Sequence, residues 1–187
     1  MIVTMEPTIL LLAYNAGYVH PAIGLRYLQA NLYRTPGKVK LLEVTRRTPR
    51  DRVLAQIIAA EPDILAVSVS IWNHLDTLAV LPVLRRLLPT TTIVLGGPEA
   101  GYLPMTAEIF RYADGVVRGE AELSFPALVE ELFDGPRGRV PAGAVRSESG
   151  PWAFDAPPPD LGQVVQPYGT FTEWDAQHRF MYLEASR

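Results

Sequence analysis

The chain has 187 residues, of which 48% are hydrophobic and 20% are charged, and its formal net charge at pH 7 is -3. This composition is that of a globular domain rather than a disordered chain, and without a run of clustered Lys and Arg it excludes a nucleic-acid-binding surface. No apolar stretch reaches the roughly 18 to 20 residues that span a bilayer and no secretory segment opens the chain, so we expect a cytoplasmic protein without membrane contact.

The first predicted strand, residues 9–14, is a continuous apolar run that ends at Asn15 and Gly17. Such a run is typical of a parallel strand that is covered on both faces. Apolar residues then recur at helical spacing from Ala22 to Leu32, and Pro36 and Gly37 end this first helix.

Four more strand and helix pairs follow in alternation. The strands are expected at residues 39–44, 64–70, 92–95 and 115–117, and the helices at residues 53–60, 75–88, 103–112 and 125–132. Pro82 falls inside the third helix, so a kink or a restart near Leu78 is expected, because proline removes a backbone donor. The alternation predicts an α/β fold of the flavodoxin-like (Rossmann-like) doubly wound class. Its parallel sheet should have five strands in the order 2-1-3-4-5 and helices on both faces.

The pattern changes after Gly135. Residues 143–146 and 152–154 flank a polar loop and predict a small C-terminal β-hairpin. The three prolines at residues 157–159 force extended chain, and the segment to Thr172 has no clear period, as in a tether. We therefore divide the chain into an α/β domain at residues 1–135, a hairpin appendage at 136–156 and a linker with one further strand at 157–187. The last part should be poorly packed unless another copy holds it.

A ligand of such a sheet binds at the carboxyl ends of the strands, in the loops at residues 15–24, 68–74, 96–101 and 119–122. Ser68 and Ser70 should share one side of the third strand and leave room beside a bulky ligand, or else bond neighbouring backbone. Gly96 and Gly97 permit close approach of a ligand, or simply form a tight turn. No glycine pattern of a dinucleotide or nucleoside-triphosphate phosphate loop is present.

Three polar residues in these loops are each open to more than one interpretation. Glu120 and Glu122 can accept hydrogen bonds from a ligand, or they can stabilise the start of the helix that follows. His20, next to Pro21, can ligate a metal, contact a substrate or merely cap a helix. No metal site and no catalytic residue is predicted, because the chain has no cysteine and no nucleophile paired with a base.

Four short motifs, taken in order, resemble the N-terminal cobalamin (vitamin B12)-binding domain of cobalamin-class radical S-adenosylmethionine (SAM) proteins. They are Asn15-Ala-Gly-Tyr-Val-His20-Pro, Ser68-Val-Ser70, Gly96-Gly-Pro-Glu99 and Arg118-Gly-Glu-Ala-Glu122, and the similarity spans roughly residues 9–135. The final residues, Tyr182-Leu-Glu-Ala-Ser-Arg187, resemble the strand that leads into the Cys-x-x-x-Cys-x-x-Cys loop of that superfamily. The resemblance therefore suggests a protein truncated before its cluster-binding cysteines.

The resemblance implies a cofactor and a partner domain. The cofactor is cobalamin, held base-off for a catalytic barrel absent from this chain, with methyl transfer as one candidate reaction. The barrel would carry a [4Fe-4S] cluster and S-adenosylmethionine. The cofactor-binding residues that it implies are Asn15, Tyr18, His20, Ser68, Ser70, Trp72, Asn73, Gly96, Gly97, Pro98, Glu99, Gly119, Glu120 and Glu122.

One departure from other cobalamin domains concerns the lower face of the cobalt. The Asp-x-His-x-x-Gly motif, whose histidine is a lower cobalt ligand in certain mutases and methionine synthases, is absent, since His20 has Tyr18 two residues before it. Two other functions stay open. One is a flavodoxin-like binding module without catalysis, although Tyr18 and His20 replace the Ser/Thr-rich flavin phosphate loop. The other is a degenerate domain that has lost cobalamin and presents a substrate or partner.

Overall fold

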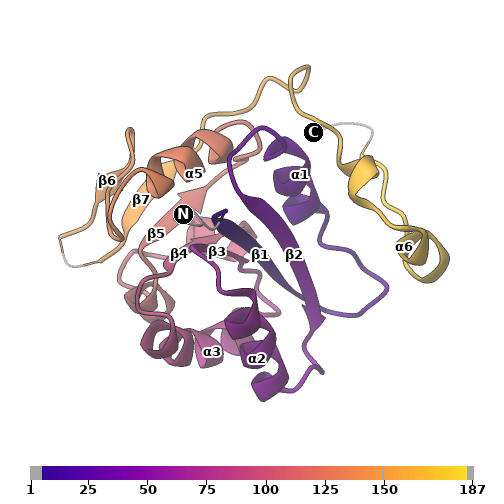
Figure 1. Cartoon of the computed structure of the whole chain (residues 1–187), viewed down its shortest axis with the longest axis horizontal. Coiled ribbons are helices and arrows are strands. Elements are labelled where there is room, and N and C mark those ends of the chain that lie inside the picture. The colour runs from indigo at the N-terminus through magenta and orange to yellow at the C-terminus, as the bar shows by residue number, and fades with distance from the viewer. Residues whose placement is uncertain (1–5, 149, 185–187) are drawn as a thin grey trace, which may run out of the picture.

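The computed structural model describes residues 6–148 and 150–184, which form one seven-stranded sheet covered by helices on both faces (Figure 1). The strand order is β2-β1-β3-β4-β5-β7-β6, so the predicted order 2-1-3-4-5 is present and is extended at the β5 side. The strands are β1 (Thr8–Asn15), β2 (Lys38–Thr45), β3 (Ile64–Ser68), β4 (Thr92–Gly96), β5 (Gly115–Arg118), β6 (Val145–Arg146) and β7 (Trp152–Asp155).

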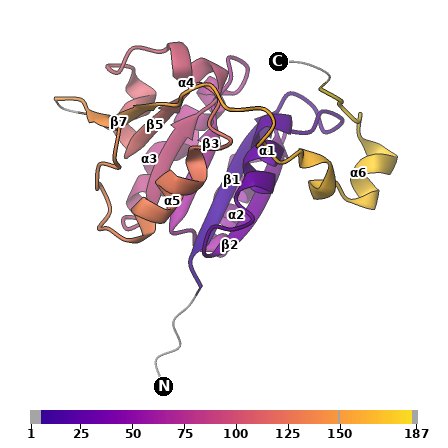
Figure 2. The same ribbon diagram turned by 90° about the horizontal axis from the view of Figure 1, so that it is seen from above.

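The helices form two layers, one on each face of the sheet (Figure 2). The α-helices are α1 (Ile23–Asn31), α2 (Arg50–Ala60), α3 (His74–Leu87), α4 (Pro98–Tyr102), α5 (Phe125–Phe133) and α6 (Glu173–His178), and the 3-10 helices are η1 (Glu108–Tyr112) and η2 (Pro167–Thr170). Helices α1 and α5 cover one face, and α2 and α3 cover the other (Figure 1).

The two faces of β1 explain why its sequence is apolar throughout. Ile9 and Leu11 belong to the core cluster under α1 and α5, whereas Leu10 and Leu12 belong to the cluster under α2 and α3. Side chains of a strand alternate between its two faces, so a central parallel strand must be apolar at every position. All four pairings among β1 to β5 are parallel, which brings the carboxyl ends of these strands to one edge.

The predicted hairpin is not an appendage but part of the main sheet. Strand β7 pairs in parallel with β5 and in antiparallel fashion with β6. Trp152 of β7 is fully buried, and its indole fills the space above Gly115, where a Cβ would lie only 2.1 Å from the ring. Because Gly115 has no side chain, β5 leaves room for Trp152, the largest side chain of the core.

Two predicted helices differ from the structure. Helix α3 runs through Pro82 without the predicted restart, because Val80, Leu81 and Leu84 anchor it in the core on both sides of the proline. Of the helix predicted at residues 103–112, only the second half is helical, as the 3-10 helix η1; the short helix α4 ends before this range at Tyr102, and a turn at Pro104 separates the two. Proline disfavours helical backbone in the residue before it, which explains this separation.

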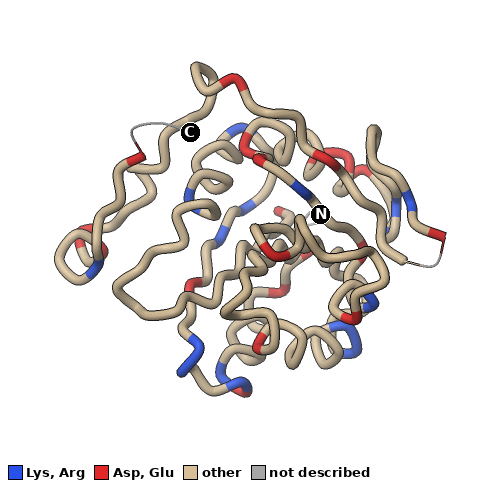
Figure 3. Tube along the Cα trace, turned by 180° about the vertical axis from the view of Figure 1, so that it is seen from behind, with Lys and Arg blue, Asp and Glu red and all other residues tan. Residues whose placement is uncertain are grey.

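The segment after the sheet is packed, contrary to the sequence-based expectation. Tyr27 and Asn31 of α1 bond to Gln166 and to the backbone of Val165, and Asp175 of α6 is buried. Of the predicted C-terminal strand, residues 182–184 have no regular secondary structure, and residues 185–187 lie outside the described part. Figure 3 shows acidic and basic residues interspersed along residues 6–148 and 150–184, without a continuous basic track in that part of the chain.

Candidate functional site

The main cavity, about 890 Å³ in volume, lies at the carboxyl ends of β1, β3, β4 and β5. Its apolar walls come from the core cluster between the sheet and helices α1 and α5: Ala13, Leu25, Ala66, Val94, Val117 and Phe125. Since Ala13 and Ala66 occupy neighbouring strands, small side chains leave the space that larger ones would fill. The size is that of a pocket for a substantial organic ligand.

The structure brings most of the predicted binding residues together at this cavity. Those that line it are Asn15, His20, Ser68, Ser70, Trp72, Asn73, Gly96, Gly97, Pro98, Gly119, Glu120 and Glu122. Two predicted residues do not line it. Tyr18 is exposed and lines a smaller neighbouring pocket of about 210 Å³. Glu99 lies at the start of α4, where its carboxylate is 3.7 Å from Nδ1 of His74.

Asn73 and Trp72 join the ends of β1 and β3. The Asn73 side chain is 2% exposed, accepts a hydrogen bond from the backbone N–H of Ser70, and donates to the carbonyls of Tyr14 and Ser68. The Trp72 indole also donates to the Tyr14 carbonyl, at 3.3 Å. These bonds fix the backbone at the mouth of the cavity and present a half-exposed indole there.

Gly97 makes a turn that other residues would not tolerate. Its φ is +93°, and a Cβ there would lie 2.8 Å from the Val69 carbonyl oxygen and 3.0 Å from Oγ of Ser68. The tight-turn interpretation of this glycine is therefore supported, and the turn itself forms part of the cavity wall. Gly119, with φ +79°, plays the same backbone role after β5, against the carbonyl of Ala156.

The carboxylates of the β5 loop lie in different environments. Glu122 is 6% exposed although it lines the cavity, whereas Glu120 is exposed at the same wall. A carboxylate buried at the edge of an apolar cavity is a strong acceptor for a ligand hydroxyl or amide. Ser70 is buried and Ser68 is half-buried beside the turn at Gly97.

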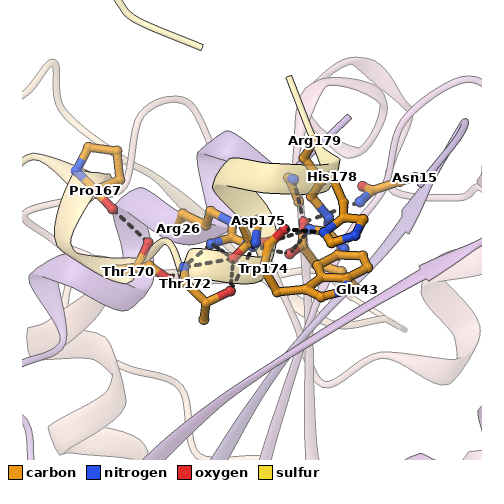
Figure 4. Close-up of polar contacts among 11 residues, drawn as sticks. Asn15, Arg26, Glu43, Pro167, Thr170, Thr172, Trp174, Asp175, His178 and Arg179 are labelled. Atoms are coloured by element: carbon orange, nitrogen blue, oxygen red, sulfur yellow. Dashed lines mark hydrogen bonds and ion pairs between the residues drawn. The ribbon is translucent and has the colours of Figure 1, made fainter. Parts of the chain in front are cut away.

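A buried carboxylate that sequence reasoning missed positions the loop after β1. Glu43 of β2 accepts hydrogen bonds from the Ala22 backbone N–H at 2.6 Å, from Asn15 at 3.2 Å and from the guanidinium groups of Arg26 and Arg179 (Figure 4). Burial alone would raise the pKa of Glu43, but the Ala22 N–H and the two arginines hold that pKa below its usual value. In the sequence, Glu43 stands out only as an acidic residue among the apolar residues Leu41, Leu42 and Val44.

The structure adds two cavity residues from the far end of the chain, Tyr182 and Glu184. The Tyr182 hydroxyl bonds to Nδ1 of His20, and the two rings stack with their centroids 6.1 Å apart. Within residues 6–148 and 150–184, no group of three or more His, Asp or Glu is placed to hold a metal ion. No helix in that part of the chain is long and apolar enough to cross a membrane.

Comparison with known proteins relates this chain to cobalamin proteins. Residues 9–129 match the family model of the B12 binding domain. The chain is 27% identical over 166 residues to an uncharacterized methyltransferase of Pyrococcus horikoshii, covering 88% of this chain and 36% of the relative. It is 33% identical over 78 residues to the cobalamin-dependent radical SAM methyltransferase TokK of Streptomyces tokunonensis, covering 41% of this chain and 12% of TokK.

A solved structure shares the fold. The apo cobalamin-dependent S-adenosylmethionine radical enzyme OxsB superposes with a TM-score of 0.63 at 16% identity, over 86% of this chain and 24% of that enzyme. The chain thus spans about a third or less of the length of these proteins.

Proposed function

This chain belongs to the B12 binding domain family, and from that premise we propose that it presents base-off cobalamin to a catalytic domain outside these 187 residues. The observation that carries the proposal is the cavity at the carboxyl edge of the parallel sheet, to whose lining each of the four motifs contributes residues. In a sheet of this class that edge is where a large cofactor binds.

The residues present fit such a cofactor. Gly97 and Gly119 keep the rim free of side chains where a Cβ would meet backbone, and Ala13 and Ala66 leave depth below it. We assign the nucleotide tail of cobalamin to this depth, beside Ser68 and Ser70. The buried carboxylate of Glu122 would accept a hydrogen bond from the tail, and the Trp72 indole would contact the corrin ring at the mouth.

We infer the base-off state from the place assigned to the nucleotide tail and from the sequence context of His20. Its Nδ1 is engaged by the Tyr182 hydroxyl, and its ring lies 5.6 Å from that of Phe180. The sequence context also lacks the Asp-x-His-x-x-Gly motif, in which a histidine is held for the metal. With its tail in the cavity, cobalamin would not coordinate cobalt through its own base, and His20, which lies outside such a motif, is not assigned as a replacement ligand.

Cobalamin would supply the chemistry of the cobalt–carbon bond, through which a methyl group can be transferred. The residues of this chain hold the cofactor, shape its pocket and exclude water from the tail. We assign the catalytic step to a barrel with a [4Fe-4S] cluster and S-adenosylmethionine outside these residues. The names of TokK and OxsB, and the greater length of both proteins, support this division of labour.

Titration with hydroxocobalamin tests the proposal directly. We expect saturable binding and, at neutral pH, a corrin absorption spectrum of the base-off type, because the tail is withdrawn into the protein. Cobinamide, which lacks the nucleotide tail, should bind more weakly. The absence of corrin that stays with the protein on gel filtration would contradict cobalamin binding, and retained corrin with a base-on spectrum would contradict the placement of the tail.

A further inference from the structure

The segment at residues 171–184, here called the C-terminal strap, is anchored by a buried ion network. Asp175 of the strap accepts hydrogen bonds from Arg26 of α1 at 3.2 and 3.3 Å, and its Oδ1 lies 3.3 Å from the Arg179 guanidinium. The side chains of Arg26, Glu43 and Asp175 are 4, 7 and 6% exposed. Figure 4 shows the two arginines and two carboxylates gathered between α1, β2 and α6.

Local interactions fix the shape of the strap around Asp175. The Asp175 carboxylate accepts from the Thr172 N–H at 2.9 Å while the Thr172 hydroxyl accepts from the Asp175 N–H at 3.1 Å, which completes a capping box. The Arg26 guanidinium lies over the Phe171 ring, 4.3 Å from its centroid. Asp175 therefore starts α6 and pairs that helix with the core.

The same network reaches the loop between β1 and α1. Glu43, which pairs with Arg26 and Arg179, also holds the Ala22 backbone N–H and the Asn15 side chain. Asn15 and Ala22 both line the cavity. One carboxylate thus connects the strap to both ends of a cavity-lining loop.

The strap then runs along that loop to the cavity. The Phe180 backbone N–H donates to the Val19 carbonyl at 2.9 Å, and Tyr182 bonds to His20. Tyr182 and Glu184 line the cavity alongside His20. The strap therefore reaches the wall of the cavity, although residues 156–170 separate it from the last strand of the sheet.

We propose that the C-terminal strap is a wall of the cobalamin pocket and holds the loop at residues 15–22 in its binding shape. Tyr182 contacts the cofactor, and Arg26, Glu43, Asp175 and Arg179 are positioning residues. This inference rests on the proposed function for the identity of the ligand, but its structural part concerns this chain alone.

The physical basis is the cost of an unpaired buried charge. Removing one partner of a buried ion network leaves the others desolvated and uncompensated, and the strap would then separate from α1. Coupling between two sites is reciprocal, so a strap that favours cofactor binding must itself be favoured by the bound cofactor.

Asp175→Asn in the full chain is the decisive variant, and Asp114→Asn is its matched control. Asp114 is a comparably buried carboxylate, 7% exposed, that pairs with Arg85 and Arg137 at the opposite end of the sheet, just before β5. Both variants should lower the melting temperature. Only Asp175→Asn should speed hydrogen exchange in residues 15–24 without cofactor, and only Asp175→Asn should raise the Kd for hydroxocobalamin, by about tenfold.

Hydrogen exchange on the wild-type chain supplies the reciprocal measurement, with slower exchange in residues 171–184 when hydroxocobalamin is bound. Equal exchange in residues 15–24 and Kd values within twofold for the two variants would overturn the proposal. Failure of the wild-type chain to bind hydroxocobalamin would instead contradict the proposed function. In that case faster loop exchange in cofactor-free Asp175→Asn would still support the structural part of the inference, and unchanged exchange would overturn it.

Tyr182→Ala provides a second variant that leaves the ion network intact. Its side chain is 40% exposed, so the fold should tolerate the change, and loss of the pocket wall should raise the Kd several-fold. Tyr102→Ala is the control, because Tyr102 is 92% exposed and does not line the cavity. Equal Kd values for these two variants would contradict a contact between Tyr182 and the cofactor.

Discussion

Arg26 and Asp175 lie 149 residues apart in the sequence and form a buried ion pair, with 3.2 Å between Nη2 and Oδ1. The pair joins the first helix of the domain to the last, and it does so next to the candidate cobalamin pocket. Buried ion pairs add little net stability compared with apolar packing, but they are costly to break. Their effect here is to fix one arrangement of the C-terminal segment.

Ala13→Phe should abolish binding of the nucleotide tail. Ala13 is 3% exposed and lines the cavity between the sheet and α1, so a phenyl ring there would occupy the assigned tail space. We expect the Kd for hydroxocobalamin to rise to that for cobinamide, which should be unchanged by the substitution. Absorbance titration with both corrinoids measures this, and a parallel loss of cobinamide binding would argue against the assigned tail site.

His20→Ala should leave the base-off spectrum of the bound cofactor unchanged. His20 lies outside an Asp-x-His-x-x-Gly motif and bonds to the Tyr182 hydroxyl, so we expect the substitution to weaken binding through the loss of that contact, without altering cobalt coordination. His178→Ala is a suitable control, because that ring bonds only to the local Trp174 carbonyl among the contacts described. An altered spectrum in His20→Ala alone would make His20 a cobalt ligand.

Gly97→Ala should destabilise the fold by about 1–3 kcal/mol, the usual cost of a side chain at a backbone conformation reserved for glycine. The new Cβ would lie 2.8 Å from the Val69 carbonyl oxygen. Gly101→Ala is the matched control, since no atom lies within 4 Å of its added Cβ and it sits in a helix. Urea denaturation compares the two, and equal midpoints would contradict the strain at Gly97.

We expect the folded protein to lose stability in acid, because the buried carboxylates of Glu43 and Asp175 are ion-paired. The paired arginines and backbone donors overcome the effect of burial and hold the pKa values of Glu43 and Asp175 below their usual range. Groups with lowered folded pKa values stabilise the protein above their unfolded pKa of about 4, and that stability is lost as the pH falls through the folded values.

Glu43→Gln should therefore be less stable than wild type at pH 7, by about 3–5 kcal/mol. Its denaturation midpoint should also change less than that of wild type as the pH falls below about 4. Glu148→Gln, at an exposed carboxylate, should follow the wild-type curve at every pH. Circular dichroism melts over a pH series test this, and parallel curves for wild type and Glu43→Gln would rule out the linkage.

Trp152→Ala should lower the free energy of unfolding by about 3–5 kcal/mol, because a fully buried indole leaves a large cavity. The loss should appear as one cooperative transition of the whole domain, since β7 is hydrogen-bonded to β5 in the main sheet. Val145→Ala on the edge strand, where the side chain is 73% exposed, should be nearly silent. Two separate thermal transitions in Trp152→Ala would indicate an independent hairpin.

Local sequence patterns were sufficient for the order of the central strands. Apolar residues alternate along the chain between strand spacing and helix spacing, and the run in β1 is apolar throughout. This pattern indicates the doubly wound α/β class, because a strand covered on both faces requires helices on both faces of the sheet. The glycines and short polar motifs that end the strands also marked the cavity edge, since parallel strands bring their carboxyl ends together. A backbone conformation that requires glycine, such as the positive φ of Gly97, is visible in the sequence as a single glycine.

Other features depended on contacts between distant residues. The continuous helix through Pro82 depends on core contacts that outweigh a local breaker, and the place of β7 beside β5 depends on the space that Gly115 leaves for Trp152. Most of all, the sequence patterns predict a parallel α/β sheet with a site at its carboxyl edge, whereas the contact of Tyr182 and Glu184 with that site is seen only in the folded chain. The buried ion network joins three separate segments of the chain through Arg26, Glu43, Asp175 and Arg179. Charged residues show no periodic pattern along the sequence, so a contact between such distant segments cannot be predicted from it.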